Sequence, residues 1–378
     1  NSAEYLPAWG MTDRALTVNA ETILVNAALS TGTGAITLNA SASATGNASG
    51  TGNTVSGEAI SAASIVVAGG ASISGGAVTL TAHAAASGTV TATGGSINNV
   101  GGSYNSTAAI EVDGTIAAAN ALKIVADVDT TVAVAMSNAS GFLIFGADLD
   151  GIAVNSTNSA TVNIGAVAVS GATIEIGADT DVDIDVTVNN VTLQGLAFGT
   201  QNVAVSATVS NTTTITIAGD AQLTQAGAGT IGTTGKAVTA SATDDTDVTL
   251  IVNADANMRI PVVTTGAAFF DALTVDTSVV RTTDVKIGAL DAEAPTAPTT
   301  PTIQAAGAIA LSASSTGDIS GDAQTDFVGV TTNDATENTQ VRTNGATLKG
   351  SSVSMSASSA TNFTAKGQES VNEIDGKI

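Results

Sequence analysis

The residues best suited to chemistry in this chain are aspartates that alternate with other residues. Asp179, Asp181, Asp183 and Asp185 occupy every second position of one short stretch. In a β-strand this spacing places all four carboxylates on one face, about 6.5–7 Å between neighbours. Like charges arranged in this way repel each other, and a bound cation would relieve the repulsion.

Acidic residues recur at the corresponding place in other parts of the chain, each time after an alanine that ends an apolar alternation. Asp127 and Asp129 form one such pair, and Asp245 and Asp247, with Asp244 beside them, form another. Ca²⁺ prefers several oxygen ligands, so these eight alternating aspartates are candidate Ca²⁺ ligands. The spacing matches neither an EF-hand nor a glycine-rich calcium-binding nonapeptide. Three interpretations therefore stay open: a solvated acidic face, a divalent-cation site, and the carboxylates of a polysaccharide lyase or hydrolase.

Other catalytic chemistry has few candidates. The chain has no cysteine and one histidine, His83, which alternation places on the outward face with no local partner. No Gly-x-Ser-x-Gly elbow surrounds a serine, and the glycine pairs lack the lysine and helix of a phosphate loop. Lys and Arg stand singly, whereas a lyase for acidic sugars needs clustered bases. The sequence predicts a protein without catalytic residues and without a required cofactor.

The net charge of the chain excludes some classes of binding partner. The formal net charge is −23, from 10 basic and 33 acidic residues. Phosphate neutralisation needs a basic surface, so nucleic-acid binding is not expected. An anionic membrane would repel this chain, and no uninterrupted apolar stretch approaches the length of a transmembrane helix.

The elements that must position the aspartates are β-strands. Period-2 alternation recurs along the chain, for example at 35–40, 77–82 and 173–178, with Val, Ile, Leu or Ala on one face and Thr, Ser, Asn or Asp on the other. Aromatic residues make up only 3% of the chain, whereas a string of β-sandwiches would need larger core residues. The pattern predicts an all-β fold with a narrow core of small side chains.

A repeated unit accompanies the alternation. An apolar-x-apolar-x-Ala pattern begins at Ile36, Val78, Leu122, Ile174, Val238, Ile309 and Val353, and three of the six intervals are 42 or 44 residues. An upstream strand precedes the pattern by about 12 residues in several units. We interpret the unit as two coils of about 22 residues each, which predicts an elongated parallel β-helix, or β-solenoid, of roughly 17 coils and about 80 Å.

Composition suggests a division of the chain. Residues 1–15 hold the only Trp and one of two Tyr, and we expect an aromatic segment or cap there. Residues 16–290 and 304–365 are predicted solenoid repeats, separated at 291–303 by a Pro/Thr-rich loop or linker whose prolines recur every third residue. Residues 366–378 are more charged, lack alternation and are predicted to be a tail or cap.

The units at 109–134, 160–186 and 213–252 share one form: a strand, a turn, a strand ending in Ala, an Asp-rich stretch and a Val-rich strand. This form resembles the repeats of giant bacterial filamentous adhesins, the filamentous-haemagglutinin-like and leukotoxin-like exoproteins. The resemblance implies secretion, a right-handed β-helical fibre at the cell surface, and roles in adhesion.

These observations predict an extracellular structural protein that forms or joins a surface filament by end-to-end or lateral self-association. Two alternatives remain open besides the enzyme: an adhesin segment that binds glycans or a host protein through loops at 94–107 and 291–303, and a surface-layer protein.

Overall fold

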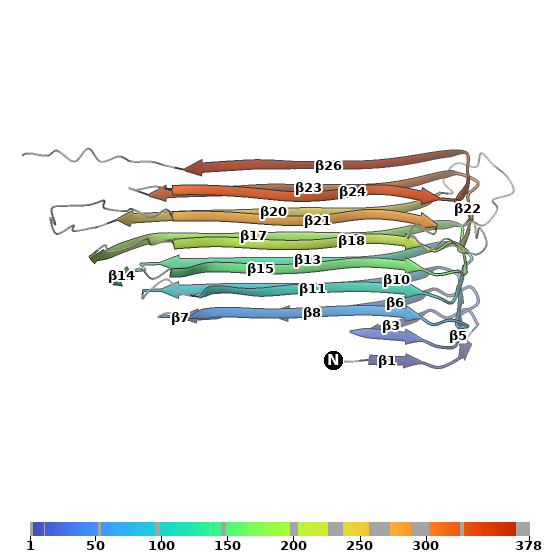
Figure 1. Ribbon diagram of the computed structural model, residues 1–378. Helices are drawn as coiled ribbons and strands as arrows, with labels where there is room; N and C mark the ends of the chain where they lie inside the picture. Colours follow the sequence, from blue (N-terminus) through green and yellow to red (C-terminus); the bar gives the residue numbers. More distant parts are fainter. Residues whose placement is uncertain are drawn as a thin grey trace, which may run out of the picture.

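The computed structural model is an all-β protein whose strands run parallel in three stacked sheets (Figure 1). It describes residues 3–10, 12–51, 54–94, 99–138, 140–144, 149–196, 203–225, 237–256, 273–288, 302–325 and 329–367. Within these ranges there is no helix. The predicted parallel β-solenoid is therefore confirmed.

Two sheets consist mainly of long strands, and the third closes one side of the stack. Sheet A contains β1 (Ala3–Leu6), β4 (Thr22–Val25), β8 (Val55–Val67), β11 (Val100–Val112), β15 (Leu149–Ile164), β18 (Val203–Ile217), β21 (Leu273–Gly288) and β24 (Gly329–Asn344). Sheet B contains the short strands β2 (Trp9–Gly10), β5 (Ala28–Ser30), β9 (Ser72–Gly75), β12 (Thr115–Ala118), β16 (Ala168–Gly171), β19 (Gln222–Gln225), β22 (Thr302–Gln304) and β25 (Thr347–Lys349). Sheet C contains β3 (Leu16–Ala20), β6 (Ile36–Thr45), β10 (Val78–Thr93), β13 (Ala121–Ser137), β17 (Thr173–Leu196), β20 (Val238–Ala256), β23 (Ala308–Thr325) and β26 (Ser352–Gly367), with β7 (Ala48–Gly50) and β14 (Ser140–Ile144) paired beside them.

Each coil takes one strand from each sheet, and the coil length corrects the prediction of about 22 residues. Ile36 lies beside Val78, Val78 beside Leu122, and Leu122 beside Ile174, so successive coils are offset by 42, 44 and 52 residues. The repeated unit is thus one wide coil and not two narrow ones. Only the first step, from Leu16 to Ile36, spans 20 residues.

The physical reason for the error is strand length. The predicted strand, aspartate-rich stretch and Val-rich strand of a unit are one continuous strand, as in β13 and β17. The described strands build eight coils, so the predicted 17 coils are wrong. At about 4.8 Å per step the stack rises about 34 Å, and the protein is broader along its strands than it is tall. The handedness of the coil stays a prediction.

Small apolar side chains fill the interior. Strands alternate buried and exposed positions, as in β10 and β13, because successive side chains point to opposite faces of a strand. The buried residues form two hydrophobic clusters. We call the cluster beside sheet B the near half, which includes Ile65, Ile110 and Ile215, and the other the far half, which includes Val55 and Val279.

The two ends of the stack differ. β1 and β3 of the first coil have four and five residues, whereas β24 and β26 of the last coil have sixteen each. Residues 3–10, predicted to be an aromatic segment or cap, form strands of the first coil, where Tyr5 and Trp9 are exposed.

The predicted interruption at 291–303 falls largely outside the described residues, as do 368–378 of the predicted tail. Residues 302–304 form β22, which pairs with β19 and β25, and the same three sheets continue on both sides of the segment. The loop predicted at 94–107 is partly wrong, because residues from Val100 onward belong to β11.

Candidate functional site: an acidic ladder and a polar column

The predicted cation ligands come together on the outer face of sheet C. Asp127 and Asp129 lie on β13, the four alternating aspartates on β17, and Asp245 and Asp247 on β20. These three strands are neighbours in the sheet. We call the set the acidic ladder: Asp127, Asp129, Asp179, Asp181, Asp183, Asp185, Asp245 and Asp247.

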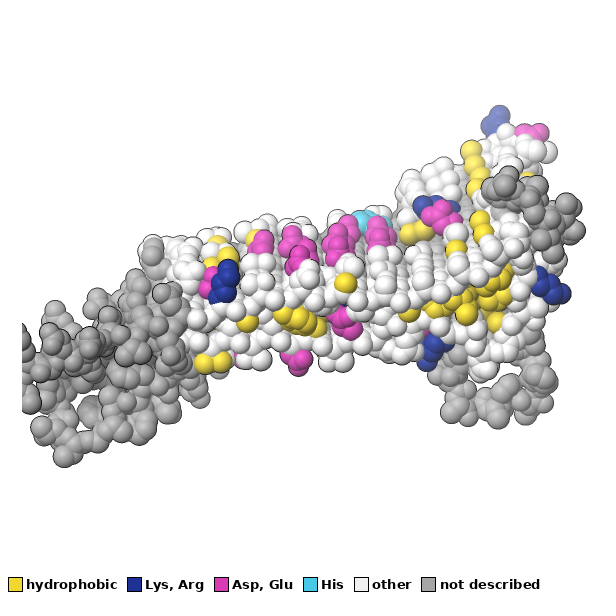
Figure 2. All heavy atoms as spheres, turned by 90° about the horizontal axis from the view of Figure 1, so that it is seen from above, with side chains coloured by type: hydrophobic (Ala, Val, Ile, Leu, Met, Phe, Trp, Pro, Cys, Tyr) yellow, Lys and Arg dark blue, Asp and Glu magenta, His cyan; other side chains and the backbone are white. Residues whose placement is uncertain are grey.

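Strand register aligns the ladder into columns that run across the strands. Asp127 pairs with Asp179, and Asp129 pairs with Asp181, which pairs in turn with Asp245. Asp183 pairs with Asp247. Seen from above, acidic side chains follow one long side of the molecule, with the single histidine beside them (Figure 2).

Crowding of carboxylates perturbs their protonation. Partial burial, and then the charge of Asp127, raise the pKa of Asp129 and of Asp179 above the ordinary value. The pKa of Asp181 is raised by burial and by the neighbouring charges of Asp129 and Asp245. Burial and Asp185 raise the pKa of Asp183. A raised carboxylate pKa means that the folded chain holds these negative charges at a cost.

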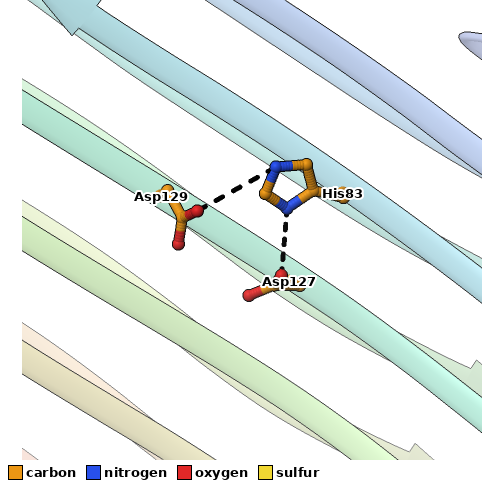
Figure 3. A group of neighbouring side chains, drawn as sticks. All are labelled: His83, Asp127 and Asp129. Carbon is orange, nitrogen blue, oxygen red and sulfur yellow. Dashed lines mark hydrogen bonds and ion pairs between the residues drawn. The ribbon is translucent and has the colours of Figure 1, made fainter.

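His83 lies at one end of the ladder, and the expectation that it has no partner is wrong. It faces Asp127 across the strand pair, with Nδ1 2.9 Å from Oδ2 of Asp127 and Nε2 3.9 Å from Oδ2 of Asp129 (Figure 3). The side chain of His83 is 34% exposed. The partners escaped sequence analysis because they lie 44 and 46 residues away in the next coil.

The geometry of this group decides what it can do. In Figure 3 each ring nitrogen of His83 faces the carboxylate of a different aspartate. One ligand atom from each of His83, Asp127 and Asp129 lies within 4.8 Å of the ligand atoms of the other two. This spacing makes the three side chains a candidate cation-binding group, and the contact between Nδ1 of His83 and Asp127 is also short enough for a hydrogen bond.

A second polar feature, which sequence analysis missed, lies inside the stack between the two apolar clusters. Buried side chains from sheets A and C form a hydrogen-bonded chain that ascends through the coils. We call it the polar column: Ser106, Thr130, Asn158, Asn211, Thr246, Asp244, Arg281 and Glu337. All except Glu337 are at most 1% exposed.

The lower part of the column is neutral. Ser106 lies 3.1 Å from Thr130, whose hydroxyl donates to Oδ1 of Asn158 at 2.7 Å. Nδ2 of Asn158 donates to Oδ1 of Asn211 at 2.9 Å, and Nδ2 of Asn211 donates to the Thr246 hydroxyl at 2.8 Å. Each amide therefore links two coils through the interior.

The upper part carries charge. The Thr246 hydroxyl donates to Oδ1 of Asp244 at 2.7 Å, and Nη1 of Arg281 lies 3.7 Å from the same oxygen. Burial raises the pKa of Asp244 to about 6, although Thr246 and Arg281 act in the opposite direction. Arg281 also donates to Glu337 and to Thr361 of the last coil. The column thus ends in ion pairs at the end of the stack.

The sequence gives only weak signals for the column, because polar residues occupy both the inward and the outward positions of these strands. Asn158 and Asn211 stand within runs of Ser, Thr and Asn, where inward and outward positions look alike. Their inward position becomes evident only from the register of β15 against β18.

Comparison of the chain with protein-family models, with curated proteins and with solved structures found no match. The fold and the two polar features alone therefore define the class, a parallel β-solenoid of wide, three-stranded coils. No helix in the described part of the chain is long and apolar enough to cross a bilayer.

Proposed function

We propose that this chain is an extracellular, non-catalytic structural protein that belongs to a surface fibre, and that it builds the fibre through self-association of its solenoid. The observation that carries the proposal is the exposure of apolar side chains on β26, the last strand that the structure describes. Val353, Met355 and Phe363 of β26 are 45%, 53% and 52% exposed. Their partners in the preceding coil, Ile309, Leu311 and Ile319, are at most 1% exposed.

The difference has a simple cause. These three residues occupy the same inward positions as their buried partners, but within the described chain no coil follows to cover them. The edges of β24 and β26 likewise carry backbone groups with no further strand beside them in the described sheets. An open edge with apolar side chains favours addition of another chain. Repeated addition of identical subunits yields a filament, or a closed oligomer if the contact is two-fold.

Negative-stain electron microscopy of the full chain at high concentration tests the proposal. We expect rods, fibres or discrete multimers, formed with or without Ca²⁺. Single particles of monomer size under all conditions would overturn it.

We also propose that the acidic ladder collects divalent cations, with Ca²⁺ the first to test. Aligned carboxylates on neighbouring strands about 4.8 Å apart can share one ion at the 2.3–2.6 Å typical of Ca²⁺–oxygen bonds. The raised pKa values of Asp179 and Asp181 support this proposal, because a cation would offset the repulsion that contributes to them.

Isothermal titration with CaCl₂ at constant ionic strength tests cation binding. We expect heat that the triple variant D129N/D181N/D245N loses and that E111Q, an exposed carboxylate on sheet A, retains. Equal heats in the triple variant and the wild type would contradict a site on the ladder.

A further inference from the structure

We infer that the His83 end of the acidic ladder binds a divalent d-block metal ion, with Zn²⁺ the one to test, through Nε2 of His83 and the carboxylate of Asp129. The inference rests on the proposed cation binding by the ladder and deepens it, because it assigns a second class of ion to one place on that surface. Imidazole nitrogen is a preferred ligand of Zn²⁺, Cu²⁺ and Ni²⁺, whereas Ca²⁺ takes oxygen ligands.

The composition of the chain leaves one place for such a ligand. His83 is the only histidine and the chain has no cysteine, so no second imidazole and no thiolate can attract these metals elsewhere. Strand register places His83 opposite Asp127, and Asp129 lies two residues further along the same face of β13. This end of the ladder therefore adds a nitrogen ligand to its carboxylates, whereas the rest of the ladder consists of carboxylates alone.

Asp127 determines which ring nitrogen of the histidine is available to a metal. Nδ1 of His83 lies 2.9 Å from Oδ2 of Asp127, a distance at which the Nδ1–H group of a neutral imidazole donates a hydrogen bond to the carboxylate (Figure 3). The lone pair of the ring then resides on Nε2. Histidines that ligate metals commonly donate their second ring nitrogen to a carboxylate, which fixes the orientation of the ring and raises its basicity. Asp127 is thus a positioning residue for this metal.

The distance between Nε2 and the second carboxylate suits a shared ion. Nε2 of His83 lies 3.9 Å from Oδ2 of Asp129, which is too long for a hydrogen bond. Zn²⁺ binds nitrogen at about 2.0–2.1 Å and carboxylate oxygen at about 2.0–2.2 Å, so one ion can join two ligand atoms that lie up to about 4.2 Å apart. Tetrahedral coordination brings the two atoms to about 3.4 Å. A movement of about half an ångström in these surface side chains would therefore complete the geometry.

The surrounding charge favours a dication at this point. Asp181 lies in register with Asp129 and adds a negative charge on the next strand, about 4.8 Å away. In the described part of the chain, His83 is the only basic side chain in an ion-pair contact with the ladder. A bound dication would supply the positive charge that these carboxylates lack. The side chain of Asp129 is 50% exposed, so water can reach the ion as a further ligand.

The single histidine allows a direct test by NMR, because its ring nitrogens give one pair of signals in a long-range ¹H–¹⁵N spectrum of the full chain. An equimolar amount of ZnCl₂ should shift the Nε2 signal and leave Nδ1 protonated. The variant D127A should let the two tautomers exchange and weaken Zn²⁺ binding by about tenfold or more. A purely structural role of Asp127 would not change the tautomer. Ring signals that do not respond to ZnCl₂ would overturn the inference.

Isothermal titration with ZnCl₂ separates this site from the Ca²⁺ binding proposed for the ladder. H83N and D129N should each raise the Zn²⁺ dissociation constant by about tenfold or more, since loss of even an outer partner of a metal ligand has an effect of that size. The control E111Q, at an exposed position of sheet A, should leave the constant unchanged. H83N should also leave the heat of Ca²⁺ binding unchanged.

The outcomes distinguish the two proposals. Equal Zn²⁺ affinity in H83N and the wild type would overturn this inference and leave the Ca²⁺ proposal standing. A Zn²⁺ heat that depends on His83, without any heat from CaCl₂, would support this inference and overturn the Ca²⁺ proposal. No heat with either ion would overturn both.

Discussion

Asp244 and Asp245 are neighbours in the sequence and belong to opposite environments. Asp245 lies outside on the acidic ladder, where Asp181 faces it from the adjoining strand. Asp244 lies inside at 0% exposure, and Thr246, Thr213 and Arg281 surround its carboxylate. The ladder is a set of like charges in contact with water, whereas the column is a set of buried groups that hydrogen-bond or form ion pairs with one another, with Nε of Arg281 left without a partner.

The comparison shows that a solenoid can repeat the same type of side chain at one position in successive coils. In-register stacking places equivalent residues of successive coils about 4.8 Å apart, so one acidic position becomes a row of charge. On the outside, water and salt weaken the resulting repulsion. Inside, the same stacking is stable only when hydrogen bonds and opposite charges compensate each buried group. Substitutions should therefore be far more costly in the column than in the ladder.

The largest loss of unfolding free energy is expected from the variant R281M. Loss of the guanidinium leaves Asp244 and Glu337 without their cationic partner, and removing one member of a buried ion pair costs about 3–5 kcal/mol of unfolding free energy. The control is K123M, which breaks a 2.9 Å pair with Glu175 whose side chains are 47% and 55% exposed. That control should cost no more than about 1 kcal/mol in urea unfolding. Equal losses in the two variants would contradict the distinction between the buried ion pairs of the column and an exposed ion pair on the outer face.

The unfolding free energy should depend on pH because of Asp244. Its pKa is about 6 in the folded chain against an ordinary 3.8, so the folded state holds the proton more tightly than the unfolded state. The unfolding free energy should therefore be highest below about pH 4 and fall by about 3 kcal/mol as the pH rises through 6. D244N should abolish this fall, measured by urea unfolding in high salt to screen the ladder. D334N, at an exposed position of β24, should retain it; the same fall in D244N would show that Asp244 is not its source.

A smaller loss of unfolding free energy is expected from the variant N158A. The variant removes one buried hydrogen bond from each of Thr130, Ser156 and Asn211, which should cost about 1–3 kcal/mol of unfolding free energy. Asn155 lies on the same strand but faces water, so N155A should change the unfolding free energy by less than about 0.5 kcal/mol. An unchanged unfolding free energy in N158A would mean that the column contributes little to stability.

The smallest effect, with the opposite sign, is expected from D181N. Asp181 faces Asp129 and Asp245, and removal of its charge should stabilise the chain by a few tenths of a kcal/mol. The gain should appear as a higher melting temperature in low salt and should vanish in high salt. A destabilised D181N, in low salt and without divalent cations, would show that the ladder carries a structural role beyond repulsion.

The sequence contained enough to predict the fold class and the ladder, because both depend on period 2. Alternation of Val, Ile and Ala with polar residues determines the strands, and alternating aspartates determine one face. Coil length was predicted wrongly because polar residues such as Asp127 and Asp129 look like a break between strands but lie within β13. The column and the partners of His83 could not be predicted, since they depend on residues that meet only through register between coils.

Sedimentation of the wild-type chain over a wide concentration range tests the central claim, self-association through the exposed apolar side chains of β26, most directly. The monomer mass is 36.5 kDa. The account predicts a species of at least twice that mass, which F363D shifts toward the monomer and I60D, at a residue 63% exposed on β8, does not. A mass of one chain at every concentration, with and without Ca²⁺, would contradict the account.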